Sequence, residues 1–255
     1  MKIKKKWVER FGAVLFVVAM LAIWQLLSAF NAISPLFFPS PSRTFTALWN
    51  QFAQGHAWTP LSATVLRMIY GWLAASIAGV VLGAMVAGSR LSKELLGPLL
   101  EFVRPIPASA FIPVAILMFG LSNNISTAII AFGSIWPVLL SAVKGFSSVD
   151  ERLYEVAAAM GMSKLHRFWK ISLPSALPDI MAGARVGLAV ALILAVVTEM
   201  QASLPGLGSS ILMAQRSFRT PDLYASVIML GCVGFLASAL LQWTERRMLK
   251  WRLAA

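Results

Sequence analysis

Residues 155–174, EVAAAMGMSKLHRFWKISLP, form a polar and basic segment between two apolar runs that are each long enough to cross a membrane. Gly161 stands near the middle of this segment and Pro174 closes it. Glycine permits a positive φ at the end of a helix, and proline interrupts a helix because it has no N–H. The segment therefore predicts two short helices joined at Gly161, set between membrane-spanning helices and ended by Pro174.

The composition of the whole chain agrees with a membrane fold. Of 255 residues, 58% are hydrophobic and only 13% are charged, whereas soluble domains have about 25% charged residues. Several nearly uncharged runs approach the roughly 20 residues that a helix needs to cross a bilayer. We expect an all-α, polytopic helical bundle forming one domain over residues 1–255. About six spans are predicted, at residues 11–30, 62–89, 95–121, 125–143, 180–200 and 225–243.

The basic residues indicate the orientation of this bundle. The net charge is +12, and the Lys and Arg residues cluster beside the apolar runs. If residues 1–10 are cytoplasmic, sixteen Lys and Arg fall on the cytoplasmic side and three on the other. Cytoplasmic segments carry this excess in membrane proteins, so both termini and the loop at 144–178 are predicted to be cytoplasmic. Nucleic-acid binding is not expected, since no basic patch is interleaved with stacking aromatic residues.

The loop at about 148–174 has two physical interpretations. Ser148 or Asp150 suits an N-cap for a first helix with a shallow surface of small residues at 157–159, and Ser163 suits the N-cap of a second. The second helix, residues 164–172, combines apolar and aromatic side chains with Lys164, Arg167 and Lys170. It could dock on another protein or lie on an anionic membrane surface. The physics of the segment alone leaves these two alternatives equal.

Ionisable residues also occur inside the predicted spans. Arg67 and Glu199 both fall toward the outer side, where a pair could act as a lock or as a structural tie. Arg104 is followed by Pro105 and Pro107 in the third span. A broken membrane helix is tolerated only inside protein or along a watery cavity. We therefore expect Arg104, Pro105 and Pro107 near the translocation pathway, with Arg67 and Glu199 as further candidates.

Catalytic and metal-binding motifs are not found in the sequence. His56 and His166 fall on opposite sides of the predicted membrane, and Cys232 is the single cysteine. No phosphate-binding glycine loop of the P-loop type occurs. We expect a non-enzymatic chain with no cofactor or metal of its own.

From about residue 39 to 252 the chain resembles the inner-membrane permeases of binding-protein-dependent ATP-binding-cassette (ABC) importers. The resemblance is greatest to their nitrate/sulfonate/taurine branch. Outside the 155–174 segment it is carried by PSPS at 39–42, Leu66-Arg67, Glu101 with RPIP at 104–107, Ile112-Pro113, Phe119-Gly120, SVD at 148–150, ALP at 176–178, Gly183 with Arg185, Glu199 and GLG at 206–208. It implies the type I importer permease fold, a homodimer, two cytoplasmic ATPase subunits that bind ATP and Mg, and an external substrate-binding protein.

The resemblance also assigns roles within the loop. It implies that Glu155 makes a charged contact with the ATPase, that Gly161 forms the turn, and that residues 163–172 seat in a cleft on that partner. Val156 departs from the family pattern, which usually has alanine there. The implied coupling residues are Glu155, Ala157, Gly161, Ser163, Lys164, Leu165, Arg167, Phe168, Ile171, Leu173 and Pro174.

The expected function is therefore that of a permease in a bacterial inner membrane. Members of this branch carry small, often anionic solutes such as taurine, alkanesulfonates, nitrate, bicarbonate or aromatic acids, and some carry thiamine-precursor pyrimidines. The alternatives are an ATP-independent secondary transporter or channel, or an integral membrane enzyme. A secondary transporter would be favoured by an internal repeat with a mid-membrane ion site, and neither is evident in the sequence.

Overall fold

The computed structural model describes residues 2–30, 34–103, 105–120 and 122–250, and these residues fold into helices without strands. Four helices in this part of the chain are long and apolar enough to cross a membrane. They contain four of the predicted apolar runs and include polar residues at their ends. The four are α3 (Trp58–Ala87), α6 (Asn123–Ser147), α9 (Leu173–Ala202) and α11 (Thr220–Met248).

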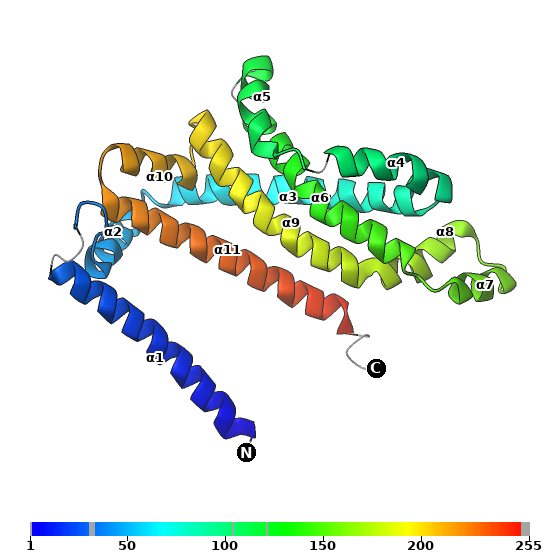
Figure 1. Ribbon diagram of the computed structural model, residues 1–255, viewed down its shortest axis with the longest axis horizontal. Helices are drawn as coiled ribbons and strands as arrows, with labels where there is room; N and C mark the ends of the chain where they lie inside the picture. The colour runs from blue at the N-terminus through cyan, green and yellow to red at the C-terminus, as the bar shows by residue number, and fades with distance from the viewer. Residues whose placement is uncertain (1, 31–33, 104, 121, 251–255) are drawn as a thin grey trace.

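The predicted third span is broken. It consists of α4 (Arg90–Val103), the short 3-10 helix η1 (Ala108–Ala110) and α5 (Phe111–Phe119). The two halves, Glu94–Val103 and Ala108–Phe119, are apolar enough together to make one span but are bent by 64°. Pro105 and Pro107 lie at the break, where they remove two backbone N–H donors. In Figure 1, α4 runs beside α3 whereas α5 projects away from the bundle.

The predicted first span lies in α1 (Lys2–Ala29). Its apolar part in the described structure, Leu15–Ala29, is shorter than a full span. Within the described residues, four of the six predicted spans are long and apolar enough to cross a membrane on their own, or five if the bent pair counts as one span. In Figure 1, α1 diverges from the bundle. Its C-terminal part is anchored by Trp24, whose Nε1 donates to the carbonyl of Pro39 at 3.1 Å.

Close packing around α6 forms the centre of the bundle. Three glycines of α3 each face a side chain of α6: Gly71 faces Ile130, Gly79 faces Val138 and Gly83 faces Ala142. A Cβ on Gly83 would lie only 2.5 Å from the Cβ of Ala142. On α9, a Cβ on Gly183 would lie 2.5 Å from the Cβ of Ser141. Small residues therefore let both α3 and α9 approach α6, as expected for helices that associate within lipid.

Short helices lie at both ends of the long ones (Figure 1). At one end, α7 (Glu151–Ala159) and α8 (Lys164–Arg167) lie on the same side as the C-terminal end of α11. At the opposite end lie α2 (Pro41–Ala53) and α10 (Leu207–Arg216). We refer to these as the α7–α8 end and the α2–α10 end.

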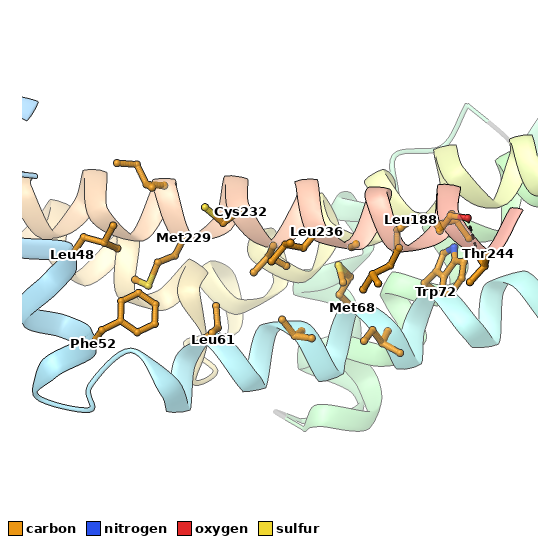
Figure 2. Close-up of a pocket in the computed structure, with 17 residues that line it drawn as sticks. Leu48, Phe52, Leu61, Met68, Trp72, Leu188, Met229, Cys232, Leu236 and Thr244 are labelled. Atoms are coloured by element: carbon orange, nitrogen blue, oxygen red, sulfur yellow. Dashed lines mark hydrogen bonds between the residues drawn. The ribbon is translucent and has the colours of Figure 1, made fainter. Parts of the chain in front are cut away.

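An apolar groove of about 560 Å³ runs between α3 and α11. Figure 2 shows Phe52, Leu61, Met68 and Met229 among the side chains that line it. Two of its polar side-chain atoms are already bonded within the chain: Trp72 Nε1 donates to the carbonyl of Ala184 at 2.8 Å, and Thr244 Oγ1 donates to that of Leu241 at 2.7 Å. The groove therefore offers mainly apolar contact.

Candidate functional site

The segment at 148–174 begins with α7, whose N-terminus is capped as the sequence suggests. Of the two candidate caps, Asp150 takes the role, because its side chain accepts a hydrogen bond from the N–H of Arg152 at 3.0 Å. Glu151 adds a negative charge to the first turn. Acidic groups at a helix N-terminus are stabilising because they satisfy free N–H groups and oppose the helix dipole.

Gly161 ends α7 with a tight reversal. Its φ is +68°, a conformation that side-chain-bearing residues rarely adopt. The N–H of Met162 donates to the carbonyl of Ala157, and the N–H of Gly161 donates to that of Ala158, both at 3.0 Å. This pair of bonds is the Schellman motif, which satisfies carbonyls at a helix end. The predicted glycine turn is thus present.

The second helix starts as predicted but does not end at Pro174. Ser163 caps it by accepting from the N–H of His166 at 3.3 Å. The chain then passes through a π-helical turn, η2 (Phe168–Ser172), directly into α9, so Lys164–Ala202 is one continuous helix. The prediction that Pro174 ends the second helix was therefore wrong. The π turn shifts the backbone hydrogen bonds from i→i−4 to i→i−5 just before Pro174, and the helix continues through it. Pro174 then falls in the first turn of α9, where its missing N–H matters least.

Side-chain contacts fix this segment to the ends of α6 and α9. The hydroxyls of Tyr154 and Ser172 lie 2.8 Å apart and join α7 to the π turn. The ring of Phe168 stacks on that of Phe146 from α6, with 5.8 Å between centroids and 23° between planes. The segment is therefore a structured unit that is attached to two spanning helices.

The same unit leaves several large apolar side chains uncovered. Met160 and Leu165 are each 69% exposed, Trp169 is 60% exposed and Val156 is 58% exposed. Glu155 is also exposed. Exposed apolar side chains rimmed by charged ones are typical of an interaction surface. We call these five residues the exposed face of the unit.

The sequence-predicted coupling residues occupy three environments. Ala157 is buried against the chain's own interior, so of the three alanines only Ala158 and Ala159 remain exposed. Exposed are Glu155, Gly161, Ser163, Lys164 and Leu165, whereas Arg167, Phe168, Ile171, Leu173 and Pro174 are partly buried.

At the α2–α10 end, Arg67 and Glu199 form a buried ion pair between α3 and α9. Glu199 is fully buried, and its Oε2 also accepts from Thr64 Oγ1 at 3.0 Å and from the N–H of Gly208 at 2.9 Å. Arg67 Nη2 donates to the carbonyl of Pro205 at 3.3 Å. A buried ion pair is stable only when hydrogen bonds such as these compensate for lost hydration.

This network also shapes the loop before α10. Gly208 is the second residue of α10, so the Glu199 carboxylate sits at the N-terminus of that helix. The N–H of Leu207 donates to Thr64 Oγ1 at 2.8 Å. A Cβ on Gly206 would lie 2.2 Å from the carboxyl carbon of Glu199. The glycine therefore leaves room for a carboxylate that ties α3, α9 and α10 together.

The third predicted region is the broken span. Arg104 lies outside the described residues, while Pro105 and Pro107 are exposed at the break. A hollow of about 400 Å³ adjoins the break and lies against α6 and α9. The two prolines are thus close to a cavity, although they do not line it.

Three residues of these sites, Thr64, Tyr154 and Ser172, were not predicted to take part in them. Thr64 stands three residues before Arg67, which places both on one face of α3, and this spacing could have indicated its role. The contact between Tyr154 and Ser172 has no comparable signal, because it depends on the π turn.

The helical bundle with its broken span and anchored polar unit has the architecture of a transport permease. The chain belongs to the family described as binding-protein-dependent transport system inner membrane component, whose model matches residues 76–250. An Escherichia coli (strain K12) permease protein named for aliphatic sulfonates transport is 30% identical over 247 residues, 97% of this chain and 94% of the relative. The taurine transport system permease protein of the same organism is 29% identical over 237 residues, 91% and 86% of the two chains.

A solved structure agrees with this assignment at the level of the fold. The methionine ABC transporter MetNI in an inward-facing conformation contains a chain that superposes with a TM-score of 0.56 at 18% identity, covering 76% of this chain and 92% of that one. The predicted all-α fold and importer-permease family, including the sulfonate/taurine branch, are therefore confirmed. The chain is a membrane permease subunit of an ABC importer.

Proposed function

We propose that two copies of this chain form the membrane pathway of an ATP-driven importer for a small sulfonate-type anion. Two ATPase subunits bind at the α7–α8 end, and an external binding protein delivers the solute at the α2–α10 end. The substrate class follows from the two relatives that are named for aliphatic sulfonates and taurine. The excess of Lys and Arg beside the loop at 144–178 and near both termini supports a cytoplasmic position for the α7–α8 end in a bacterial inner membrane.

The observation that carries the coupling role is the anchored unit at 148–174. Its exposed face provides apolar contacts, while Tyr154 and Phe168 connect it to the π turn and to α6. A push on this unit would therefore reach α6 and α9 directly. ATP and Mg bind in the ATPase partner, since this sequence has no P-loop.

Docking is favoured by the importer-permease family to which the chain belongs, and the acidic residues of α7 suit a protein partner. Glu151 and Glu155 are both exposed on this short helix. The cytoplasmic leaflet carries a negative surface potential that attracts basic segments and repels acidic ones. A protein partner can instead meet Glu155 with a basic side chain while it covers Met160 and Leu165.

The test is uptake by the purified complex in liposomes. The chain is co-expressed with its ATPase and supplied with its binding protein, and uptake of methanesulfonate, taurine and butanesulfonate is measured with and without ATP. We expect ATP-dependent uptake of at least one sulfonate. Glu155→Lys should abolish both uptake and copurification of the ATPase, whereas Glu155→Asp, which keeps the charge, should retain both. Uptake by the permease alone without ATP would contradict the importer function.

A further inference from the structure

The apolar groove of Figure 2 follows two membrane-spanning helices and is open along its side. On α11 its lining extends from Ile228 to Thr244, which is about 24 Å of helix at about 1.5 Å per residue. The hydrocarbon core of a bilayer is about 30 Å thick, so the groove is long enough to follow most of that depth. Leu236 and Leu240, which line it, are 58% and 65% exposed. The groove therefore opens toward whatever surrounds α3 and α11 within the membrane.

Basic side chains follow directly after one end of this groove. Its lining begins near Phe52 of α2 and reaches Thr244 of α11 at the other end (Figure 2). Arg247 is exposed and follows Thr244 by three residues, so the two occupy neighbouring positions on the helix surface. Arg246 and Lys250 are exposed in the same final stretch. A cluster of cations thus adjoins the end of the groove that lies nearest to the C-terminus of α11.

A cation–π contact positions the Arg247 side chain. Its guanidinium carbon lies 4.6 Å from the centre of the Trp243 ring. Trp243 is 56% exposed, and tryptophans at the ends of spanning helices lie at the level of the lipid headgroups. The nearby carboxylate of Glu245 is paired with Arg185 of α9, and no carboxylate of the described residues pairs with Arg247. The charge of Arg247 is therefore available to an anion at headgroup level.

We propose that this groove binds an acyl chain of one anionic phospholipid, whose phosphate is held at Arg247. An acyl chain needs only apolar contact, which the lining of the groove provides. The guanidinium supplies charge-assisted hydrogen bonds to phosphate oxygens, and basic pockets between spanning helices on the cytoplasmic side suit anionic headgroups. The assignment to the inner leaflet rests on the orientation given under the proposed function.

The charges of the chain favour a lipid over helix α1 as the occupant. In this chain α1 diverges from the bundle beyond its anchor at Trp24 (Figure 1). Residues 2–10, at the start of α1, contain five Lys and Arg and one Glu. If α1 of either copy filled the groove in the predicted orientation, this basic segment would lie beside Arg246, Arg247 and Lys250, and like charges repel. A phosphate neutralises the same cluster.

The first test measures lipid binding to the full-length chain, purified in detergent with its co-expressed ATPase, by native mass spectrometry. The probes are phosphatidylglycerol and phosphatidylcholine with identical acyl chains, and phosphatidylglycerol should bind more tightly. Arg247→Gln should raise the Kd for phosphatidylglycerol about fivefold, the effect of one basic residue near a membrane surface, and leave phosphatidylcholine unchanged. Arg216→Gln, an exposed arginine of α10 at the other end, is the matched control and should change neither Kd. Equal Kd values for the two lipids in the wild type, or equal effects of the two variants, overturn the proposal.

The second test fills the groove. Cys232 is exposed and lines it (Figure 2), so Cys232→Trp occupies open space instead of the packed interior. Ala239 is exposed on the same helix without lining the groove, and Ala239→Trp is the control. Cys232→Trp should weaken binding of both lipids at least about tenfold, as expected if about two methylene groups lose their contacts. The thermal unfolding midpoint checks that both variants are folded. A wild-type Kd in folded Cys232→Trp overturns the proposal.

The third test identifies the occupant in the membrane. A photo-crosslinking amino acid is placed at Leu236, which lines the groove, or at its neighbour Phe235, which is 73% exposed but does not line it. In membranes that contain both lipids, adducts from position 236 should be enriched in phosphatidylglycerol relative to those from position 235. An adduct of position 236 with α1 of either copy, or equal lipid adducts from both positions, overturns the proposal.

These measurements need no transport, so they separate the lipid site from the proposed function. If no ATPase copurifies or no sulfonate is taken up, the proposed function fails, and the same binding measurements on the full-length chain alone still decide the lipid site. If uptake is normal but phosphatidylglycerol shows no preference for the groove, the importer function stands and the lipid site is wrong.

Discussion

The Glu199 network and the exposed face of the unit at 148–174 lie at opposite ends of the bundle and use their side chains in opposite ways. At the α2–α10 end, the carboxylate of Glu199 is fully buried and its partners, Arg67, Thr64 and Gly208, all belong to the same chain. At the α7–α8 end, Met160 and Leu165 are mostly exposed although their helices are firmly anchored. The Glu199 network is completed within the chain, whereas the exposed face consists of side chains that nothing in the described part of the chain covers. The predicted effects of substitution differ accordingly.

The largest effect is expected at Glu199. Glu199→Ala leaves the buried Arg67 guanidinium without its carboxylate partner. It also removes the carboxylate that accepts from the N–H of Gly208 at the start of α10. Together these losses should cost about 3–5 kcal/mol of folding free energy. The measurement is the midpoint of thermal unfolding in detergent, together with the amount of protein in the membrane. Arg67→Met combined with Glu199→Leu replaces the pair by apolar groups and should recover much of the loss. If Glu199→Ala were as stable as the wild type, the network would not be what holds α3, α9 and α10 together.

A charge on the exposed face should act on assembly instead of folding. Met160→Asp places a carboxylate where an apolar side chain is 69% exposed, and it should lower copurification of the ATPase at least about tenfold, or about 1.4 kcal/mol. Met213→Asp, at a 66% exposed methionine on α10, is the matched control and should leave copurification unchanged. Equal losses from both variants would remove the distinction between the two ends.

The turn between α7 and α8 tests whether the shape of the unit matters. Gly161→Val forces a β-branched residue into a φ of +68° and should cost about 1–2 kcal/mol while loosening the reversal. Gly161→Asn tolerates the same conformation better and should keep most activity. The readout is uptake per ATP hydrolysed, which should fall in the valine variant and stay near normal in the asparagine variant. Full coupling in Gly161→Val would contradict the role of the turn.

The smallest effect is expected at the contact between α7 and the π turn. Tyr154→Phe removes one hydroxyl that lies 2.8 Å from that of Ser172. A partly buried hydrogen bond contributes about 0.5–1.5 kcal/mol, so the permease should remain folded and bound to the ATPase. Uptake per ATP should decrease modestly because α7 is less firmly attached to α9. If uptake per ATP hydrolysed is unchanged, the stacked rings of Phe146 and Phe168 would be the contact that couples the unit to the spanning helices.

Local sequence signals predicted much of this architecture. Apolar runs located the spanning helices, Asp150 and Ser163 were identified as cap candidates, and the glycine turn at 161 was expected. Arg67 and Glu199 were also assigned to the same end of the bundle, where they are now seen paired. These features depend on periodicity, on single-residue preferences and on topology, all of which can be derived from the chain.

Features that depend on tertiary packing could not be predicted. Pro174 was expected to end a helix, because nothing in the sequence announces the π turn that lets α8 continue into α9. The bond from the N–H of Gly208 to Glu199 requires the loop before α10 to fold back over α9. Pro105 and Pro107 predict that the third span is broken, but they do not specify the 64° angle between its halves.

Docking of the ATPase on the unit at 148–174 accounts for how ATP hydrolysis would reach α6 and α9. A photo-crosslinking amino acid placed at Leu165, which is 69% exposed, tests it most directly in the co-expressed complex. The same residue placed at Met213 serves as the control at the other end. We expect an adduct with the ATPase subunit from position 165 and none from position 213. An adduct with lipid alone at position 165, in a complex that still contains the ATPase, would contradict it.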